Sequence, residues 1–235
     1  MRATKLVTAF LATGLLFCLT ASLTTQAGNG IKGSAHDFSI KVWNFRKEIC
    51  RVCHVPHDHD RTFKRGLAGL LWNHAFSSAT YTMYQSETLD GAQDTQPTGI
   101  AKMCLGCHDG TVALDAFDKN PVNTGGPKLT GGFRIPGLNY WNTGQTIGDL
   151  RATHPLSIIY DETKDKGLAP KTTAMGTSGP ISKVLEGGTK LQCHSCHDVH
   201  DEKGEAVPNT HLLRVAQSTA QGGTASGLCL TCHIK

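Results

Sequence analysis

Four Cys-x-x-Cys-His motifs constrain this chain more than any other feature. They occupy residues 50–54, 104–108, 193–197 and 229–233. The Cys and His content of the chain would give roughly 0.02 such motifs by chance. The pattern is typical of covalent haem attachment, in which both thiols bond to one porphyrin and the following His binds its iron. We therefore expect four covalent haem c groups. The predicted attachment residues are Cys50, Cys53, Cys104, Cys107, Cys193, Cys196, Cys229 and Cys232.

Two other uses of paired cysteines explain the pattern less well. Eight Cys in an exported chain could form four disulfides, but a disulfide scaffold needs no His after each second Cys. Structural zinc sites also use Cys-x-x-Cys pairs, but they combine two such pairs and do not require the fixed His.

Residues 1–27 are predicted to be a secretory signal peptide. Arg2 and Lys5 form a charged start, an apolar run follows over residues 6–19, and small residues precede Gly28. The apolar run is short for a membrane span, and no integral membrane segment is expected elsewhere. Export agrees with haem attachment, so we expect an extracellular protein, with the periplasm as the alternative.

The remaining residues, 28–235, are predicted to form a single domain of mostly irregular coil with short α-helices. Only 39% of all residues are hydrophobic and 6% aromatic, so four stacked haems are expected to supply much of the core. We expect short helices over residues 38–53, around each motif and over residues 181–186. The predicted leader carries two of the 23 Lys and Arg and none of the 19 Asp and Glu, so the remainder is nearly neutral. No basic patch predicts nucleic-acid binding.

The chain also contains a degenerate repeat. Two dihaem units are predicted, at about residues 36–118 and 181–235, each with two motifs and with a His seven residues after its first Cys. The segment between them, residues 119–180, is rich in Gly and Pro and shows no helix or strand period. A loop of this length is uncommon in a compact domain, and we expect it to wrap the haems.

The motifs supply one axial ligand for each iron: His54, His108, His197 and His233. Eight other His could fill the four distal positions, so two His per iron are expected. The favoured distal ligands are His74, His154, His57, His200 and His36. His74 follows an apolar Leu-Trp-Asn stretch, and His154 is held in an extended backbone by Pro155. The other three, His194, His59 and His211, are expected to face solvent or propionates.

Several segments give the chain a resemblance to a known family. The Gly33–Ser39 stretch (GSAHDFS), Trp72-Asn73-His74, the CLGCHDG sequence at residues 104–110 and Thr153-His154-Pro155 accompany the motifs. Together they resemble the doubled-CXXCH multihaem cytochromes, and in particular the OmcE-type extracellular tetrahaem cytochromes of metal-reducing bacteria. The resemblance implies head-to-tail polymerisation of identical subunits into a filament with a continuous haem chain. It also implies that His36 ligates a haem of the adjacent subunit.

These features predict an electron-transfer protein rather than an enzyme. Its expected partners are identical subunits, redox partner cytochromes and extracellular electron acceptors. A soluble periplasmic tetrahaem shuttle is the main alternative. A multihaem reductase is less favoured, because all four motifs end in His and distal candidates exceed the vacancies.

Overall fold

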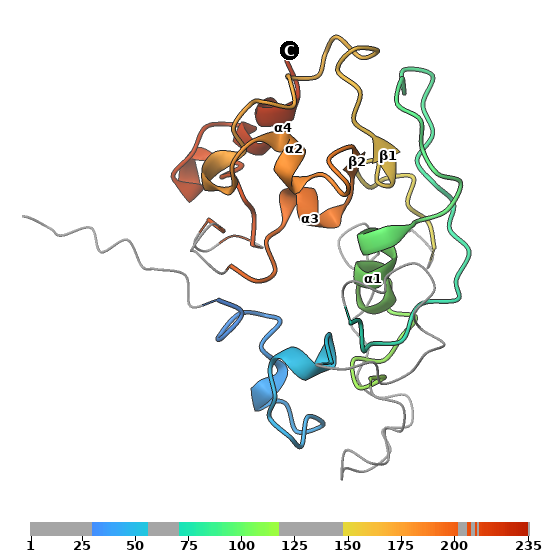
Figure 1. Ribbon diagram of the computed structural model, residues 1–235, viewed down its shortest axis with the longest axis vertical. Helices are drawn as coiled ribbons and strands as arrows, with labels where there is room; N and C mark the ends of the chain where they lie inside the picture. The colour runs from blue at the N-terminus through green and yellow to red at the C-terminus, as the bar shows by residue number, and fades with distance from the viewer. Residues whose placement is uncertain are drawn as a thin grey trace, which may run out of the picture.

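The structure is a computed structural model that describes residues 30–55, 71–117, 148–201, 206–207, 210 and 212–234. The predicted leader, His57, His59, His211 and most of the first half of the Gly- and Pro-rich segment lie outside the described residues. Figure 1 shows loops and turns wound around a few short elements, with residues 30–55 at one end of the long axis and α4 near the other.

The described elements are short. The α-helices are α1 (Gly99–His108), α2 (Ile181–Val184), α3 (Cys193–Cys196) and α4 (Gly227–Cys232). The 3₁₀ helices are η1 (Phe38–Ile40), η2 (Cys50–Val52), η7 (Gly176–Ser178) and η8 (Thr219–Gln221). Strands β1 (Ile158–Ile159) and β2 (Lys190–Leu191) pair antiparallel, with Ile158 opposite Leu191. Each motif therefore lies in or beside a helix of three to ten residues.

Residues 38–53 differ from the predicted helix. The segment begins with η1 and ends with η2, and turns closed by hydrogen bonds from Asn44 N to Lys41 O and from Lys47 N to Asn44 O lie between them. Lys47 has a φ of 55°, which no regular helix allows. Within this turn-rich segment, Phe38 and Trp43 are buried against Val52 and Phe117.

Two further apolar clusters contact the second, third and fourth motifs. One joins α1 to the preceding and following loops through Tyr81, Met83, Ala101, Leu105, Leu150 and Leu156, and Cys193 packs against it. The other joins Tyr160, Ala169, Ile181 and Leu185, with Cys232 at its edge. Helix α1 contacts α3, and α3 contacts α2. The contact between α1 and α3 runs between the two predicted repeat units, so the halves of the chain share a core.

The described half of the Gly- and Pro-rich segment contains β1 and η7, which no sequence period predicted. Elements of two and three residues are too short to show a period. Across the described part of the chain, no helix has the length and apolar character needed to cross a membrane.

Candidate functional site

All eight motif cysteines are free thiols. Cys50 and Cys229, at the first and last motifs, are exposed, whereas the other six are partly covered. Burial is the main cause that raises the pKa of Cys53 to about 11 and that of Cys107 to about 12. These two thiols are therefore protonated at neutral pH.

The cysteines of successive motifs lie close to one another in sequence order. The charge of Cys104 contributes to the raised pKa of Cys53, so the first motif lies beside the second. A hydrogen bond between Cys104 and Cys193 joins the second motif to the third, raising the pKa of Cys193 and lowering that of Cys104. The charge of Cys229 contributes to the raised pKa of Cys196, which places the fourth motif beside the third. The four attachment positions thus form an unbroken series.

Three motif histidines each face a histidine from elsewhere in the chain. The ring centroids are 5.8 Å apart for His36 and His108, and 6.1 Å apart for His54 and His200. They are 6.2 Å apart for His154 and His233. Each pair contains one predicted proximal ligand and one predicted distal ligand.

This separation fits two axial ligands of one iron. Two metal–imidazole bonds of about 2 Å each put the centres of the two rings about 6 Å apart. Aromatic side chains in simple contact have similar centroid distances, so distance alone does not decide the chemistry. The composition of the pairs does favour ligation, because each joins a motif His to a His outside the motifs. The residues present therefore fit one covalently attached haem at each of three predicted sites.

His36 lies against His108 of its own chain, which differs from the role in a neighbouring subunit that the resemblance implied. Its Nδ1 is buried and has no hydrogen-bond partner. Burial, followed by the proximity of His108, His197 and His200, lowers the pKa of His36 to about 4. The ring is therefore neutral at pH 7, the form in which imidazole binds a metal.

His154 is oriented as a metal ligand usually is. Its Nδ1 lies 2.8 Å from the carbonyl oxygen of Pro155, which leaves Nε2 for a metal. Ligating histidines commonly donate the second ring N–H to a backbone carbonyl in this way. Pro155 thus contributes its carbonyl as well as the stiff backbone that the sequence predicted.

His200 crosses between the halves of the chain. It belongs to the second predicted unit but faces His54 of the first unit. Trp72 borders this pair, with its ring edge-on to His54 at 5.8 Å. An antiparallel bridge between His54 and Trp72 holds the first motif against residues 71–74.

His74 has a different environment. Its side chain is buried, and its Nδ1 and Nε2 lie 3.1 Å and 3.3 Å from the carbonyl oxygens of Ala75 and Leu114. Cys107 Sγ lies 3.7 Å from Nε2, so His74 borders the second attachment site. Its ring faces backbone oxygens, whereas those of His36, His200 and His154 face motif histidines. The prediction for His57 falls outside the described residues.

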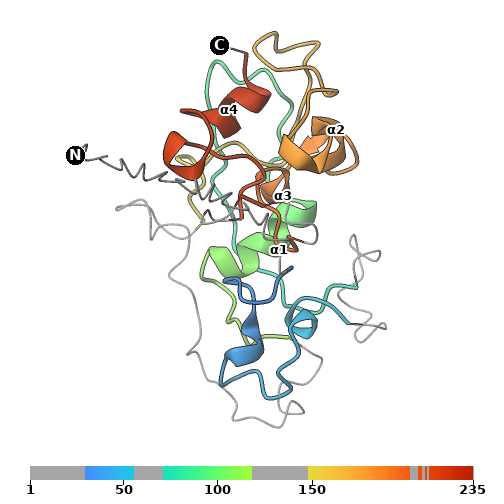
Figure 2. The ribbon, with the colours of Figure 1, turned by 90° about the vertical axis from the view of Figure 1, so that its left-hand side faces the viewer.

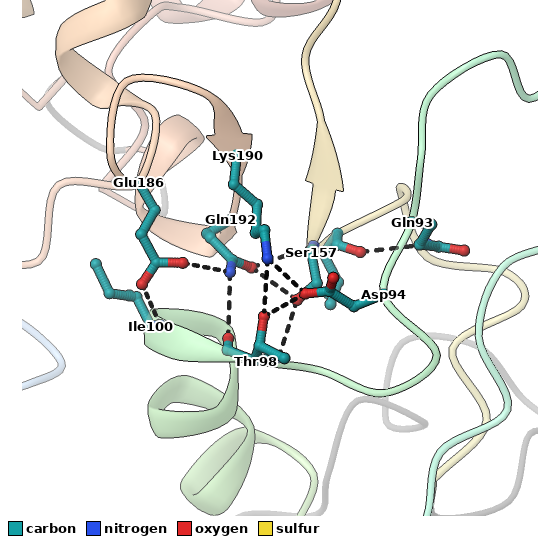
Figure 3. A network of polar contacts seen from close by, with 9 residues as sticks. Gln93, Asp94, Thr98, Ile100, Ser157, Glu186, Lys190 and Gln192 are labelled. Atoms are coloured by element: carbon teal, nitrogen blue, oxygen red, sulfur yellow. Dashed lines mark hydrogen bonds and ion pairs between the residues drawn. The ribbon is translucent and has the colours of Figure 1, made fainter. Parts of the chain in front are cut away.

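A polar network that sequence reasoning missed holds three ligand-bearing segments together (Figure 3). Gln192, directly before Cys193, is 1% exposed. Its Oε1 accepts from the backbone N and Oγ of Ser157 at 3.1 and 3.0 Å, close to His154 in sequence. Its Nε2 donates to Glu186 Oε2 at 2.7 Å and to Thr98 O at 3.2 Å. A single side chain therefore connects the start of α1, the start of α3 and the His154 segment.

Glu186 and Lys190 complete the network. Glu186 Oε1 accepts from Ile100 N at 3.1 Å, so a carboxylate covers the N-terminus of α1. Gly99 has a φ of 51°, and a Cβ there would lie 2.1 Å from the Glu186 carboxylate, so this approach requires glycine. Lys190 Nζ donates to Asp94 Oδ2 at 2.6 Å. A buried Gln before a motif has no sequence signature, because its partners are distant in the chain.

No known protein family has a sequence model that matches this chain, and no curated protein matches it either. Among the described residues, no cluster of three or more His, Cys, Asp or Glu side chains is arranged to hold a metal ion. A haem iron takes only two ligands from the protein, so a pair of histidines is sufficient for one haem.

Proposed function

We propose that this chain is an exported tetrahaem c-type cytochrome that transfers electrons. The observation that carries the proposal is the set of three histidine pairs, each joining a motif His to a second His at 5.8–6.2 Å. The eight free thiols and the four contiguous motifs support it.

When bound, each haem would supply a one-electron ferric–ferrous couple. The chain's own residues would fix both axial positions at three sites: His54 with His200, His108 with His36, and His233 with His154. Two imidazole ligands leave no position for a substrate, which favours electron transfer over catalysis. Glu186, Gln192 and Ser157 would keep the second, third and fourth sites in register.

The series of cysteines indicates a route through the molecule. The contacts between successive motifs support transfer in the order of the sequence, from the site of Cys50 to that of Cys229 or in reverse. Figures 1 and 2 place residues 30–55 and α4 toward opposite ends of the long axis, and the exposed Cys50 and Cys229 belong to these two regions. The route would therefore begin and end at the surface.

The filament implied by the resemblance remains a prediction. A head-to-tail contact that does not close on itself would bring the Cys229 end of one subunit to the Cys50 end of the next. His36 is a poor bridging ligand, because it faces His108 of its own chain. Electron microscopy of the secreted protein separates the filament from the periplasmic shuttle.

The cofactor proposal is tested by mass spectrometry and electron paramagnetic resonance of the purified protein. The denatured polypeptide is expected to retain a mass increment of four haems. The native ferric protein is expected to show low-spin signals at the three paired sites. A mass with two haems or fewer and intact cysteines would refute the proposal. A stoichiometric high-spin signal would favour the reductase alternative.

A further inference from the structure

The loop Ile40–Lys47 exposes three large apolar side chains at the Cys50 end of the molecule. Ile40 is 77% exposed, Val42 73% and Phe45 42%. Isolated apolar residues are common on surfaces, but several within one short loop mark an interaction site more often.

The loop is built to hold these side chains outward. Trp43 and Asn44, between the exposed residues, are 4% and 1% exposed. Asn44 Nδ2 donates to the carbonyl oxygens of Phe38 at 3.1 Å and Glu48 at 3.0 Å, so one buried amide ties both ends of the loop. The loop backbone is therefore fixed, and its apolar side chains stay exposed rather than folding inward.

The same loop is strongly cationic. Lys41, Arg46 and Lys47 are exposed, and no acidic residue lies between Ile40 and Lys47. The nearest exposed acid along the chain, Glu48, lies 3.5 Å from Arg51 and is paired with it. The positive charge of the loop is thus not neutralised by its own sequence neighbours.

The position of the loop relates it to electron transfer. It connects His36, which faces His108, to Cys50, the exposed thiol of the first motif. A protein seated on the loop would therefore lie beside the first attachment site and next to a ligand of the second.

We propose that the loop Ile40–Lys47 is the docking surface for an acidic redox protein that exchanges electrons through the first haem site. The inference rests on the proposed electron-transfer function. A second copy of this chain fits less well, because residues 161–171, beside Ile234 at the other end, carry equal numbers of acids and lysines. Glu162 and Lys171 there also pair with each other at 3.4 Å. In a filament, the loop of the terminal subunit would be the docking surface for the acidic redox protein.

The test uses the haem-loaded full chain and the hydroquinone form of an acidic flavodoxin as the probe. The second-order rate constant for haem reduction is measured by stopped-flow absorbance over a range of ionic strength. The double variant Lys41→Glu/Arg46→Glu is expected to reduce that constant by about tenfold or more at low salt, with the difference fading at high salt. Ile40→Ser/Val42→Ser is expected to reduce it at all salt concentrations, because it removes apolar contact.

Matched changes at the other end provide the control. Lys164→Glu/Lys166→Glu makes the same change in net charge on exposed lysines, and Ile234→Ser removes an apolar side chain that is 59% exposed. Both are expected to keep the wild-type rate. Loop variants that react as fast as wild type, or control variants that slow equally, would overturn the docking proposal.

Two further outcomes identify another occupant and would also overturn it. In the first, wild type binds vesicles of phosphatidylglycerol and phosphatidylcholine and the loop variants do not, while the rate constant for reduction by flavodoxin is the same for all of them. The other is self-association in sedimentation that only the loop variants lose. Reduction of the protein by dithionite distinguishes failure of the docking proposal from failure of the proposed electron-transfer function. If even wild type carries no haem that dithionite reduces, the electron-transfer function itself fails.

Discussion

Replacing Gln192 with Leu is expected to destabilise the protein, because it removes four buried or partly buried hydrogen bonds. The leucine side chain has a similar volume but cannot hydrogen-bond. The Ser157 hydroxyl would lose the acceptor of its hydrogen bond, and Glu186 Oε2 would lose the donor from Gln192. Ser157 N would keep its hydrogen bond to Leu191 O at 2.9 Å, and Thr98 O would keep the one that it accepts from Lys102 N at 3.4 Å. At about 1–3 kcal/mol for each unsatisfied buried group, less for the partly exposed Glu186, the expected loss is about 2–4 kcal/mol.

The free energy of unfolding is measured by urea titration of the haem-loaded protein, followed by circular dichroism. Gln93→Leu is the matched control. Gln93 Nε2 donates a hydrogen bond to Leu156 O at 3.2 Å, and its side chain is less buried than that of Gln192. Its loss is expected to cost about 1 kcal/mol. Hydrogen exchange at the amides of Ile100 and Ser157 is expected to accelerate in Gln192→Leu only. Equal unfolding free energies for the two variants would refute the assignment of Gln192 as the residue that connects the three segments.

Three other predictions concern the ligands, the network and the backbone. His200→Ala, His36→Ala and His154→Ala are each expected to convert one low-spin ferric site to high spin in electron paramagnetic resonance, whereas His59→Ala is not; unchanged spectra would contradict the pairing. Burial alone would raise the pKa of Asp94, but hydrogen bonds from Lys190 and Thr98 and the charge of Lys190 outweigh it and lower the pKa. The stability from this pair is therefore present above the ordinary Asp pKa and lost as the pH falls through the lower folded value. Lys190→Met should destabilise the protein at pH 7 but much less near pH 3, and an equal effect at both would count against the ion pair. Gly148→Ala should cost more stability than Gly222→Ala in thermal unfolding, because φ is positive at both (86° and 82°) but only at Gly148 would a Cβ lie 2.7 Å from the Thr80 oxygen.

The attachment residues could be predicted from the sequence because each site is contained within five consecutive residues. His154 could be proposed as a ligand for a similar reason, since Pro155 follows it directly and constrains its backbone. Which histidine pairs with which could not be predicted. The pairing of His200 with His54 depends on how two distant segments meet, which no local spacing encodes.

At other positions, the neighbouring residues in the sequence did not predict the local structure. The apolar approach to His74 predicted a ligand that packs on a porphyrin. In the structure it places the ring between the backbone oxygens of Ala75 and Leu114. The helix expected over residues 38–53 was replaced by turns because Asn44 satisfies the carbonyls of Phe38 and Glu48 with its side chain. The role of Gln192 could not be predicted, because its side-chain amide forms hydrogen bonds with residues from three other segments.

The crossing of His200 to His54 has a consequence for the biogenesis of the protein. A chain that emerges from a membrane pore does so from its N-terminus, so His36 and His108 are both available before the second half appears. His54 has no such early partner in this pairing and must wait until residue 200 has emerged. On the proposed ligation, the second site would mature before the first. Nascent chains that end between the second and third motifs would then carry a completed second site beside an unfinished first one. If the protein is exported as proposed, His54 would therefore lack its second histidine until residue 200 has emerged.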